Sequence, residues 1–141
     1  MIRACYADDY CVATRYGNLS KLAKVAALGS EQRLLALIDP GILDLAHLFR
    51  LHHPAYVQAF LSGTRPLATS QNLPWSPALR QAVLAMQAGQ LTGARLALED
   101  GLVGHIANGF HHAHPERGRG FCTFNGLALI AQAYPRWRIF I

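Results

Sequence analysis

The sequence has few charged residues: Asp, Glu, Lys and Arg make up 15% of its 141 residues. So low a share in a small domain leaves apolar surface to be buried against something else. Basic residues outnumber acidic ones, 13 to 8, but they are scattered and never form a run of five or more. This scatter argues against a nucleic-acid partner.

Cysteine is scarce, and long apolar runs are missing. The three cysteines, Cys5, Cys11 and Cys122, have no C-x-x-C spacing, which argues against a disulfide framework and indicates a reducing compartment. No apolar run approaches the roughly 18 residues that a membrane span needs. The first residues contain no apolar core of a signal peptide. We therefore expect a cytoplasmic protein that does not enter the membrane.

The chain has the length of one domain, and its 52% hydrophobic content is enough for a packed core. Segments that favour strands alternate with segments that favour helices, which predicts an α/β fold with a parallel sheet. Strands are expected at 2–6, 102–107 and 136–141, while residues 31–38 fit a strand or a helix turn equally well. Helices are expected at 19–28, 44–51, 55–61, 76–100 and 126–133, and loops at 14–18 and 64–74.

The helix at 76–100 has clear boundary signals. Ser76, followed by proline, fits the N-cap, and Gly101 fits the end. Gly89, Gly93 and Ala97 recur every four residues along one face. Each glycine costs a helix about 1 kcal/mol relative to alanine, and close approach of another backbone would offset that cost. We expect this face to pack tightly on the sheet.

Other helix boundaries are predicted around the first half of the chain. Gly29 is expected to end the first helix, and Asp44 to cap the second. The pair His52-His53 stands before Pro54, where a helix is broken because the residue before proline avoids the helical region. No Gly, Asp or Cys lies close to this pair in the sequence. A capping or packing role is therefore expected for it.

Residues 108–125 are the most distinctive stretch of the chain. They place His111, His112, His114 and several glycines between an apolar segment and a predicted helix. A Gly-rich loop that leaves a strand and enters a helix is where α/β proteins place their chemistry, at the C-terminal edge of the sheet. Histidines alone would indicate only an exposed loop with adventitious metal affinity.

Two parts of this loop resemble the histone deacetylase family of zinc-dependent deacetylases. They are Gly109-Phe110-His111-His112-Ala113 and Gly120-Phe121-Cys122-Thr123-Phe124-Asn125. The family usually has glycine where this chain has Asn108, and often aspartate where it has Gly126. Asparagine tolerates the left-handed region, so Asn108 can serve a glycine position. The resemblance implies a three-layer α/β/α fold of the arginase/deacetylase type with a parallel sheet, truncated after about the third strand.

The resemblance also implies a chemistry. Amide hydrolysis needs an activated water, a polarised carbonyl and an acid for the leaving amine. The match assigns the acid/base role to His111 and His112, because imidazoles titrate near neutral pH. It places Phe121 in the wall of a narrow acyl-lysine tunnel and Gly120 where the backbone approaches the substrate. Cys122 is expected to be a packed neighbour, and the implied substrate is an acetylated lysine or an acetylated polyamine.

Zinc is implied for the family domain, but no ligand is expected within this chain. In the family the ligands follow the next strand in an Asp-x-His pattern with a later Asp, and this chain ends at Ile141. We therefore expect residues 1–141 to be a single, incomplete domain, the N-terminal part of a deacetylase that is inactive alone. The strand at 136–141 would have an unpaired apolar edge, which favours self-association.

Two other functions also fit the sequence. A truncated remnant or interaction module that lacks the metal site predicts neither zinc binding nor hydrolysis. A metal-binding loop unrelated to deacetylation predicts zinc affinity that is lost when His111, His112 and His114 are changed together.

Overall fold

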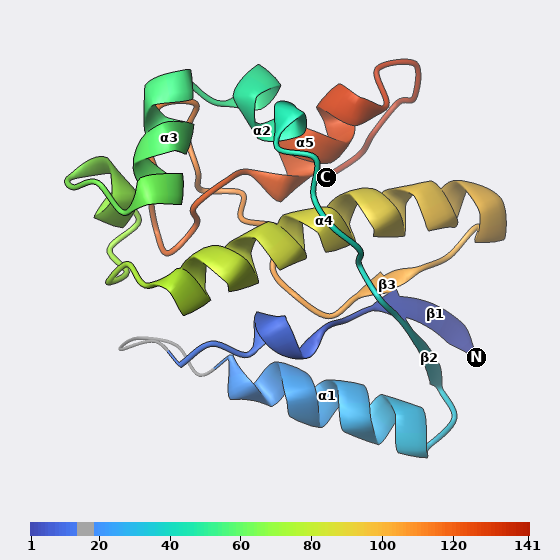
Figure 1. Cartoon of the computed structure of the whole chain (residues 1–141). Helices are drawn as coiled ribbons and strands as arrows, with labels where there is room; N and C mark the ends of the chain where they lie inside the picture. The colour runs from blue at the N-terminus through green and yellow to red at the C-terminus, as the bar shows by residue number, and fades with distance from the viewer. Residues whose placement is uncertain (14–18) are drawn as a thin grey trace.

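The computed structural model describes residues 1–13 and 19–141, so the loop expected at 14–18 lies outside the described residues. Three strands form a sheet in the order β2-β1-β3, with β1 at Ile2–Cys5, β2 at Leu35–Ile38 and β3 at Gly104–His105. Both pairings are parallel, and Cys5 lies opposite Ile38 on one side and His105 on the other. The carboxyl ends of the three strands therefore meet at one edge of the sheet (Figure 1).

Helices cover both faces of this sheet, which confirms the predicted three-layer α/β/α arrangement (Figure 1). Helix α1, Ser20–Glu31, packs on one face, and α4, Pro77–Asp100, crosses the other. Three further helices lie beyond α4. They are α2 at Ala46–Leu51, α3 at Pro54–Ser62 and α5 at Gly126–Ala133, and short 3₁₀ turns occupy Asp8–Tyr10 (η1) and Leu67–Thr69 (η2).

Most predicted helix boundaries are confirmed, because local side chains set them. Asp44 Oδ1 accepts a hydrogen bond from the Ala46 amide at the start of α2, at 2.9 Å. Ser76 Oγ accepts one from the Leu79 amide at the start of α4, at 3.0 Å. Gly101 ends α4 with a left-handed φ of 80°, a conformation that glycine adopts without strain.

Gly29 does not end α1, contrary to the prediction. The helix continues to Glu31, and residues 35–38 form a strand, which settles the ambiguity at 31–38. A Cβ on Gly29 would lie 2.5 Å from Leu35 Cδ1. The missing side chain therefore allows α1 to approach the first residue of β2 closely, and it does not terminate the helix.

Gly89 lets α4 lie close to the sheet, as the sequence predicts. A Cβ at this position would overlap the Tyr10 hydroxyl and lie 2.5 Å from His105 Nε2. The next glycine on this face, Gly93, is different, because its Cβ would find Cys5 Sγ at an ordinary 3.8 Å. The tight contact is thus confined to one turn of the helix.

We expect Gly89→Ala to lower the free energy of unfolding by about 1–3 kcal/mol, the usual cost of inserting a methyl group into a packed core. Gly93→Ala is the matched control, and it should gain up to about 1 kcal/mol because alanine is the better helix former. Urea unfolding of both variants measures the difference. Equal stability of the two variants would show that the contact at Gly89 relaxes freely.

Residues 136–141 do not form the expected strand. After α5 the chain turns, with a hydrogen bond from the Trp137 amide to the Tyr134 carbonyl at 3.0 Å, and it then runs on without a strand partner among the described residues. An apolar, β-prone composition is not sufficient, since a strand needs a neighbour for its backbone groups. The segment is exposed, with Trp137 at 60%, Phe140 at 93% and Ile141 at 86%.

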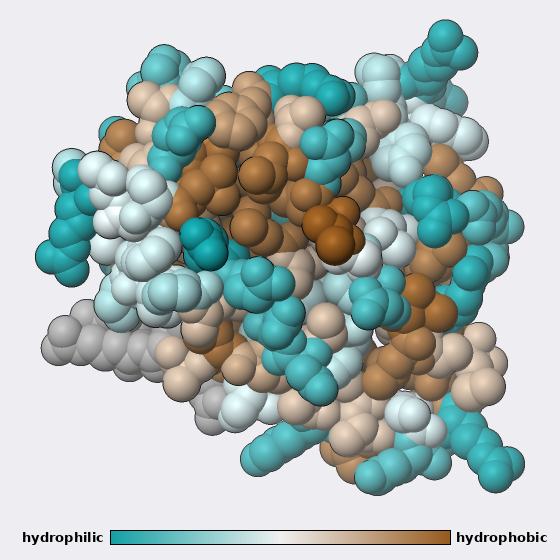
Figure 2. Space-filling model, viewed as in Figure 1, coloured by the Kyte–Doolittle hydropathy of each residue, from teal (hydrophilic) through white to brown (hydrophobic). Residues whose placement is uncertain are grey.

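Apolar side chains reach the surface elsewhere too. In Figure 2 they gather on the face over α2 and α5, and Ile42, between β2 and α2, is fully exposed. This surface agrees with the low charge of the sequence, while self-association stays a prediction. Within residues 1–13 and 19–141, none of the helices combines the length and apolarity needed to cross a bilayer.

The core has two parts, and the loop at 108–125 contributes to both. One part includes Phe60 of α3 and Phe124 of the loop. The other includes Tyr10, Met86 of α4 and Phe110 of the loop. The loop is therefore packed into the core at both ends, which fixes its position relative to α3 and α4.

Candidate active site

The tandem histidines lie on a turn that follows β3. The strand ends at His105, and the chain leaves the carboxyl edge of the sheet toward residues 111 and 112, as the sequence predicts. His111 and His112 are both exposed. Their ring centroids are 3.9 Å apart and the planes are tilted by 47°. Two imidazoles are thus presented side by side to solvent from a backbone that is anchored behind them.

Asn125 ties this turn to the start of α5. Its Nδ2 donates hydrogen bonds to the carbonyl oxygens of His111 and Ala113, each at 3.3 Å. Its Oδ1 accepts a hydrogen bond from the Ala128 amide at 3.0 Å, so the same side chain is the N-cap of α5. One residue therefore sets both where the helix begins and where the histidine turn lies.

His52 also holds the loop. Its Nδ1 faces the carbonyl oxygens of His114 at 3.0 Å and Pro115 at 3.3 Å, and its Nε2 accepts a hydrogen bond from the Asn125 amide at 3.2 Å. These partners require a proton on Nδ1 and none on Nε2. The ring is 3% exposed, and burial lowers its pKa, which favours this neutral form.

The predicted capping or packing role of the second histidine pair is confirmed. His52 is packed in the core, and His53 Nδ1 accepts a hydrogen bond from the Ala55 amide at the start of α3. The sequence did not predict the hydrogen bonds from His52 to the loop.

Further polar groups that the sequence analysis missed also fix the loop backbone. Gln87 and Gln90, polar residues on a mostly apolar helix, are the one sequence signal that could have indicated some of them, because a buried amide needs a partner. Gln90 Nε2 donates to the Asn108 carbonyl, Gln87 Nε2 to the Phe124 carbonyl and Tyr56 Oη to the Thr123 carbonyl, while Ser70 Oγ and the Gln71 carbonyl accept from the amides of Gly118 and Phe121.

Gly120 lies against the ring of His112. A Cβ on Gly120 would be 3.1 Å from His112 Cδ2, and the backbone has a left-handed φ of 55°, so both space and conformation favour glycine. Phe121 follows with a φ of 65° and a side chain that is 50% exposed. The structure thus brings Gly120 directly to the histidine pair and leaves an aromatic ring at the surface beside it in sequence.

Cys122 is a packed neighbour of the site, as expected. Its side chain is buried, and it hydrogen-bonds the backbone of His112. Burial raises the pKa of the thiol, so the nucleophilic thiolate is disfavoured.

Beneath the loop, His105 pairs with Tyr10. His105 Nε2 lies 3.2 Å from Tyr10 Oη, and the rings meet edge to face at a centroid distance of 5.6 Å. Burial lowers the pKa of His105 from 6.5 to about 4 and raises the pKa of the Tyr10 hydroxyl. Both groups are therefore neutral at pH 7.

Acid is expected to destabilise the fold through His105. Between pH 6.5 and about 4 the unfolded state binds a proton that the folded state does not, so stability falls as the pH is lowered through this window. The loss approaches roughly 3 kcal/mol. His105→Asn removes the titrating group, so its unfolding free energy should fall less between pH 7 and pH 4.5 in urea titrations. An equal fall in both proteins would assign the acid sensitivity to other groups.

The histidines of the loop do not build a metal centre. Outside the five residues at 14–18, no group of three or more His, Cys, Asp or Glu side chains is placed to hold a metal ion. His111, His112 and His114 therefore lack the geometry that a metal-binding loop would need, and the residues present do not fit a catalytic zinc.

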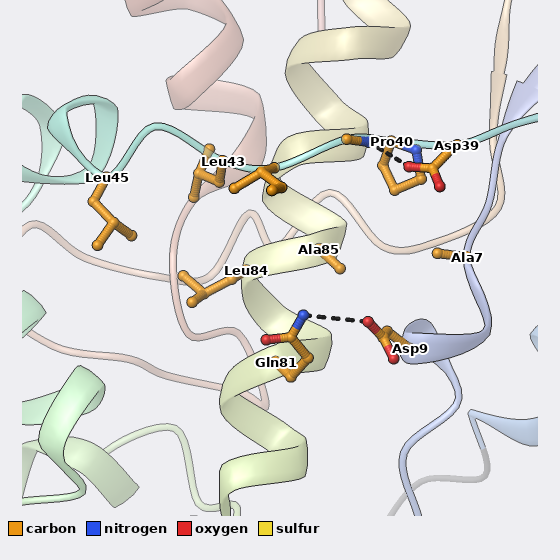
Figure 3. Close-up of a pocket in the computed structure, with 11 residues that line it drawn as sticks. Ala7, Asp9, Asp39, Pro40, Leu43, Leu45, Gln81, Leu84 and Ala85 are labelled. Atoms are coloured by element: carbon orange, nitrogen blue, oxygen red, sulfur yellow. Dashed lines mark hydrogen bonds between the residues drawn. The ribbon is translucent and has the colours of Figure 1, made fainter.

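A hollow of about 410 Å³ opens beside the carboxyl ends of β1 and β2, against α4 (Figure 3). Asp9 and Gln81 are joined across it by a hydrogen bond of 3.2 Å, and Asp39 lies on its rim. None of His111, His112, Gly120 and Phe121 lines it. The hollow is thus separate from the candidate site.

Comparisons of sequence identify similar proteins. The histone deacetylase domain profile matches residues 10–141. An uncharacterised protein of Picosynechococcus sp. is 44% identical over 93 residues, which cover 64% of this chain and 31% of that protein. Histone deacetylase 2 of Arabidopsis thaliana is 46% identical over 52 residues, which cover 36% of this chain and 13% of that protein. The chain thus spans at most 31% of the length of these curated relatives.

The fold is similar to that of a solved enzyme. The crystal structure of acetylpolyamine aminohydrolase from Burkholderia pseudomallei superposes with a TM-score of 0.77 at 15% identity, covering 96% of this chain and 53% of that one. This likeness, together with the parallel sheet between helical layers, confirms the predicted arginase/deacetylase type of fold.

Proposed function

Because the chain belongs to the histone deacetylase family, we propose that it is part of an amide hydrolase that removes acyl groups from amines, with His111 and His112 as general acid and base. The observation that carries this proposal is the pair of adjacent, exposed imidazoles on an anchored loop at the carboxyl edge of the sheet. Ligand sites of open α/β sheets lie at this edge.

The two histidines divide the proton transfers of hydrolysis. One imidazole accepts a proton from the attacking water as its oxygen bonds to the carbonyl carbon. The other donates a proton to the nitrogen as the C–N bond breaks, which yields a carboxylic acid and a free amine. Their ring separation of 3.9 Å lets both rings reach a single amide group, and acid-base groups of this kind contribute about 10²–10⁴-fold to a rate.

Gly120 and Phe121 are proposed to contact the substrate. The half-exposed ring of Phe121 offers an apolar surface for the alkyl chain of an acetylated lysine or acetylated polyamine. Gly120 leaves the ring of His112 unobstructed for the substrate, because a side chain there would press on His112, with a Cβ only 3.1 Å from the ring. Removing the ring with Phe121→Ala should therefore weaken substrate binding more than it slows proton transfer.

Zinc is proposed as the cofactor of the whole protein, following the family. When bound, a catalytic zinc polarises a carbonyl and activates water. The described residues do not supply its ligands, so the roles proposed for this chain are proton transfer and substrate contact. The same lack of ligands is equally expected of a second candidate function, in which residues 1–141 are a non-catalytic remnant or interaction module.

Hydrolysis tests the proposal in a protein that extends this chain to the length of its relatives, called the full-length protein below. The purified protein is given an acetylated lysine peptide and, separately, a monoacetylated polyamine, each with and without a zinc chelator. Release of acetate from either substrate that stops with the chelator supports a deacetylase and identifies the substrate class. Full-length protein that binds zinc but releases no acetate from either substrate contradicts it, and protein without zinc favours the remnant.

A further inference from the structure

We infer that His52 is a positioning residue for the histidine pair: it holds the His111–His112 turn in place through Asn125. The inference rests on the proposed function, since it names a residue that would support the acid-base pair without touching substrate. It is drawn from the hydrogen bonds that cross from the α2–α3 junction to the loop.

His52 bonds to the loop at two places, and both follow the catalytic turn in the chain. Directly after the turn, Nδ1 donates to the carbonyls of His114 and Pro115. At the start of α5, Nε2 accepts from the amide of Asn125. The Asn125 side chain in turn donates to the carbonyl of His111. Two hydrogen bonds therefore connect the buried imidazole to the backbone of the first catalytic histidine.

The ring of His52 is itself held firmly. It meets Phe124 at a centroid distance of 5.1 Å and Tyr56 at 5.8 Å, and it is 3% exposed. The neighbouring residue adds a backbone bond, from the His53 amide to the Pro115 carbonyl at 2.8 Å. A rigid donor and acceptor at this junction restrict the movement of the exposed turn. This restriction matters for the rate, because catalytic groups tolerate little displacement.

Three substitutions of His52 distinguish the hydrogen bonds of Nδ1 from the hydrogen bond of Nε2. His52→Gln keeps an acceptor near the position of Nε2, and His52→Asn keeps a donor near the position of Nδ1. His52→Phe fills the space without either bond. The control is His53→Asn, which removes the adjacent exposed imidazole while asparagine preserves the N-cap of α3.

The first readout does not depend on activity. NMR of the histidine rings in the 141-residue chain reports the surroundings of His111 and His112 directly. We expect their resonances to shift or broaden in His52→Phe, less in His52→Asn and least in His52→Gln, which keeps the route through Asn125. They should be unchanged in His53→Asn. Unchanged resonances in a folded His52→Phe variant overturn the inference. If that variant does not fold, equal spectra for His52→Gln, His52→Asn and the unchanged chain overturn it.

The second readout uses the full-length protein. A displaced catalytic turn should lower kcat by up to about 10²-fold in His52→Phe, with KM changed little, and His52→Gln should recover more of kcat than His52→Asn. A fall in the amount of folded protein with kcat per folded molecule unchanged would show a merely structural role and overturn the inference. Absence of hydrolysis in the unchanged protein would count against the proposed function alone, because the NMR experiment still decides the role of His52.

Discussion

Replacing His112 or His111 with alanine in the full-length protein is expected to lower amide hydrolysis by about 10²–10⁴-fold, the contribution of a general acid or base. This equals roughly 3–5 kcal/mol of transition-state stabilisation. The effect follows from the position of the two rings, which are exposed and 3.9 Å apart on an anchored turn. Initial rates on the better of the two acetylated substrates measure it.

His114→Ala is the matched control for this experiment. His114 is exposed on the same loop, and only its backbone contacts His52 and Arg117 in the hydrogen bonds that hold the loop. Its loss should change the rate by no more than a few-fold. A rate in His111→Ala and His112→Ala that matches the control would remove both residues from the mechanism.

Residues 1–141 expressed alone are expected to show no chelator-sensitive hydrolysis of an acetylated lysine peptide. A catalytic zinc needs about three protein ligands and an open position, and in the described part of the chain no such group of side chains is found. The exposed histidines cannot replace them while remaining free to move protons. The chain is purified, incubated with zinc and assayed with and without chelator.

Activity of the isolated chain that survives purification and disappears with the chelator would contradict this expectation. It would mean that the metal site is built from residues not recognised as ligands. Protein treated identically but carrying both His111→Ala and His112→Ala is the control for contaminating hydrolases.

The sequence predicted those features of the fold that depend on neighbouring residues. Ser76 and Gly101 bound α4 because a hydroxyl can accept from a nearby amide and glycine can adopt a left-handed φ. The prediction at Gly29 was wrong. A glycine can end a helix or allow another segment to pack closely against it, and only the position of Leu35 distinguishes these two cases.

Strands were harder to predict than helices, because a strand depends on a partner distant in sequence. Residues 35–38 pair with β1 and form a strand. Residues 136–141 also favour a strand by composition, but they find no such partner among the described residues. Composition alone does not separate these two cases, since the hydrogen bonds that define a strand are made across the sheet.

The candidate site likewise combines features set by neighbouring residues with features set by residues distant in sequence. His111 and His112 were predicted from a local motif, whereas the groups that hold them come from other helices. Gln87 bonds to a carbonyl 37 residues away, and His52 to an amide 73 residues away. Local sequence patterns do not register such separations. The burial of these polar side chains is seen only in the structure.

The assignment of His111 and His112 to proton transfer is tested most directly by measuring zinc content and turnover on the same preparations of the full-length protein, His111→Ala and His112→Ala. The account predicts that each variant keeps the zinc content of the unchanged protein while its turnover falls by about 10²–10⁴-fold. Loss of stoichiometric zinc together with activity in either variant would contradict it, because that histidine would then be a metal ligand.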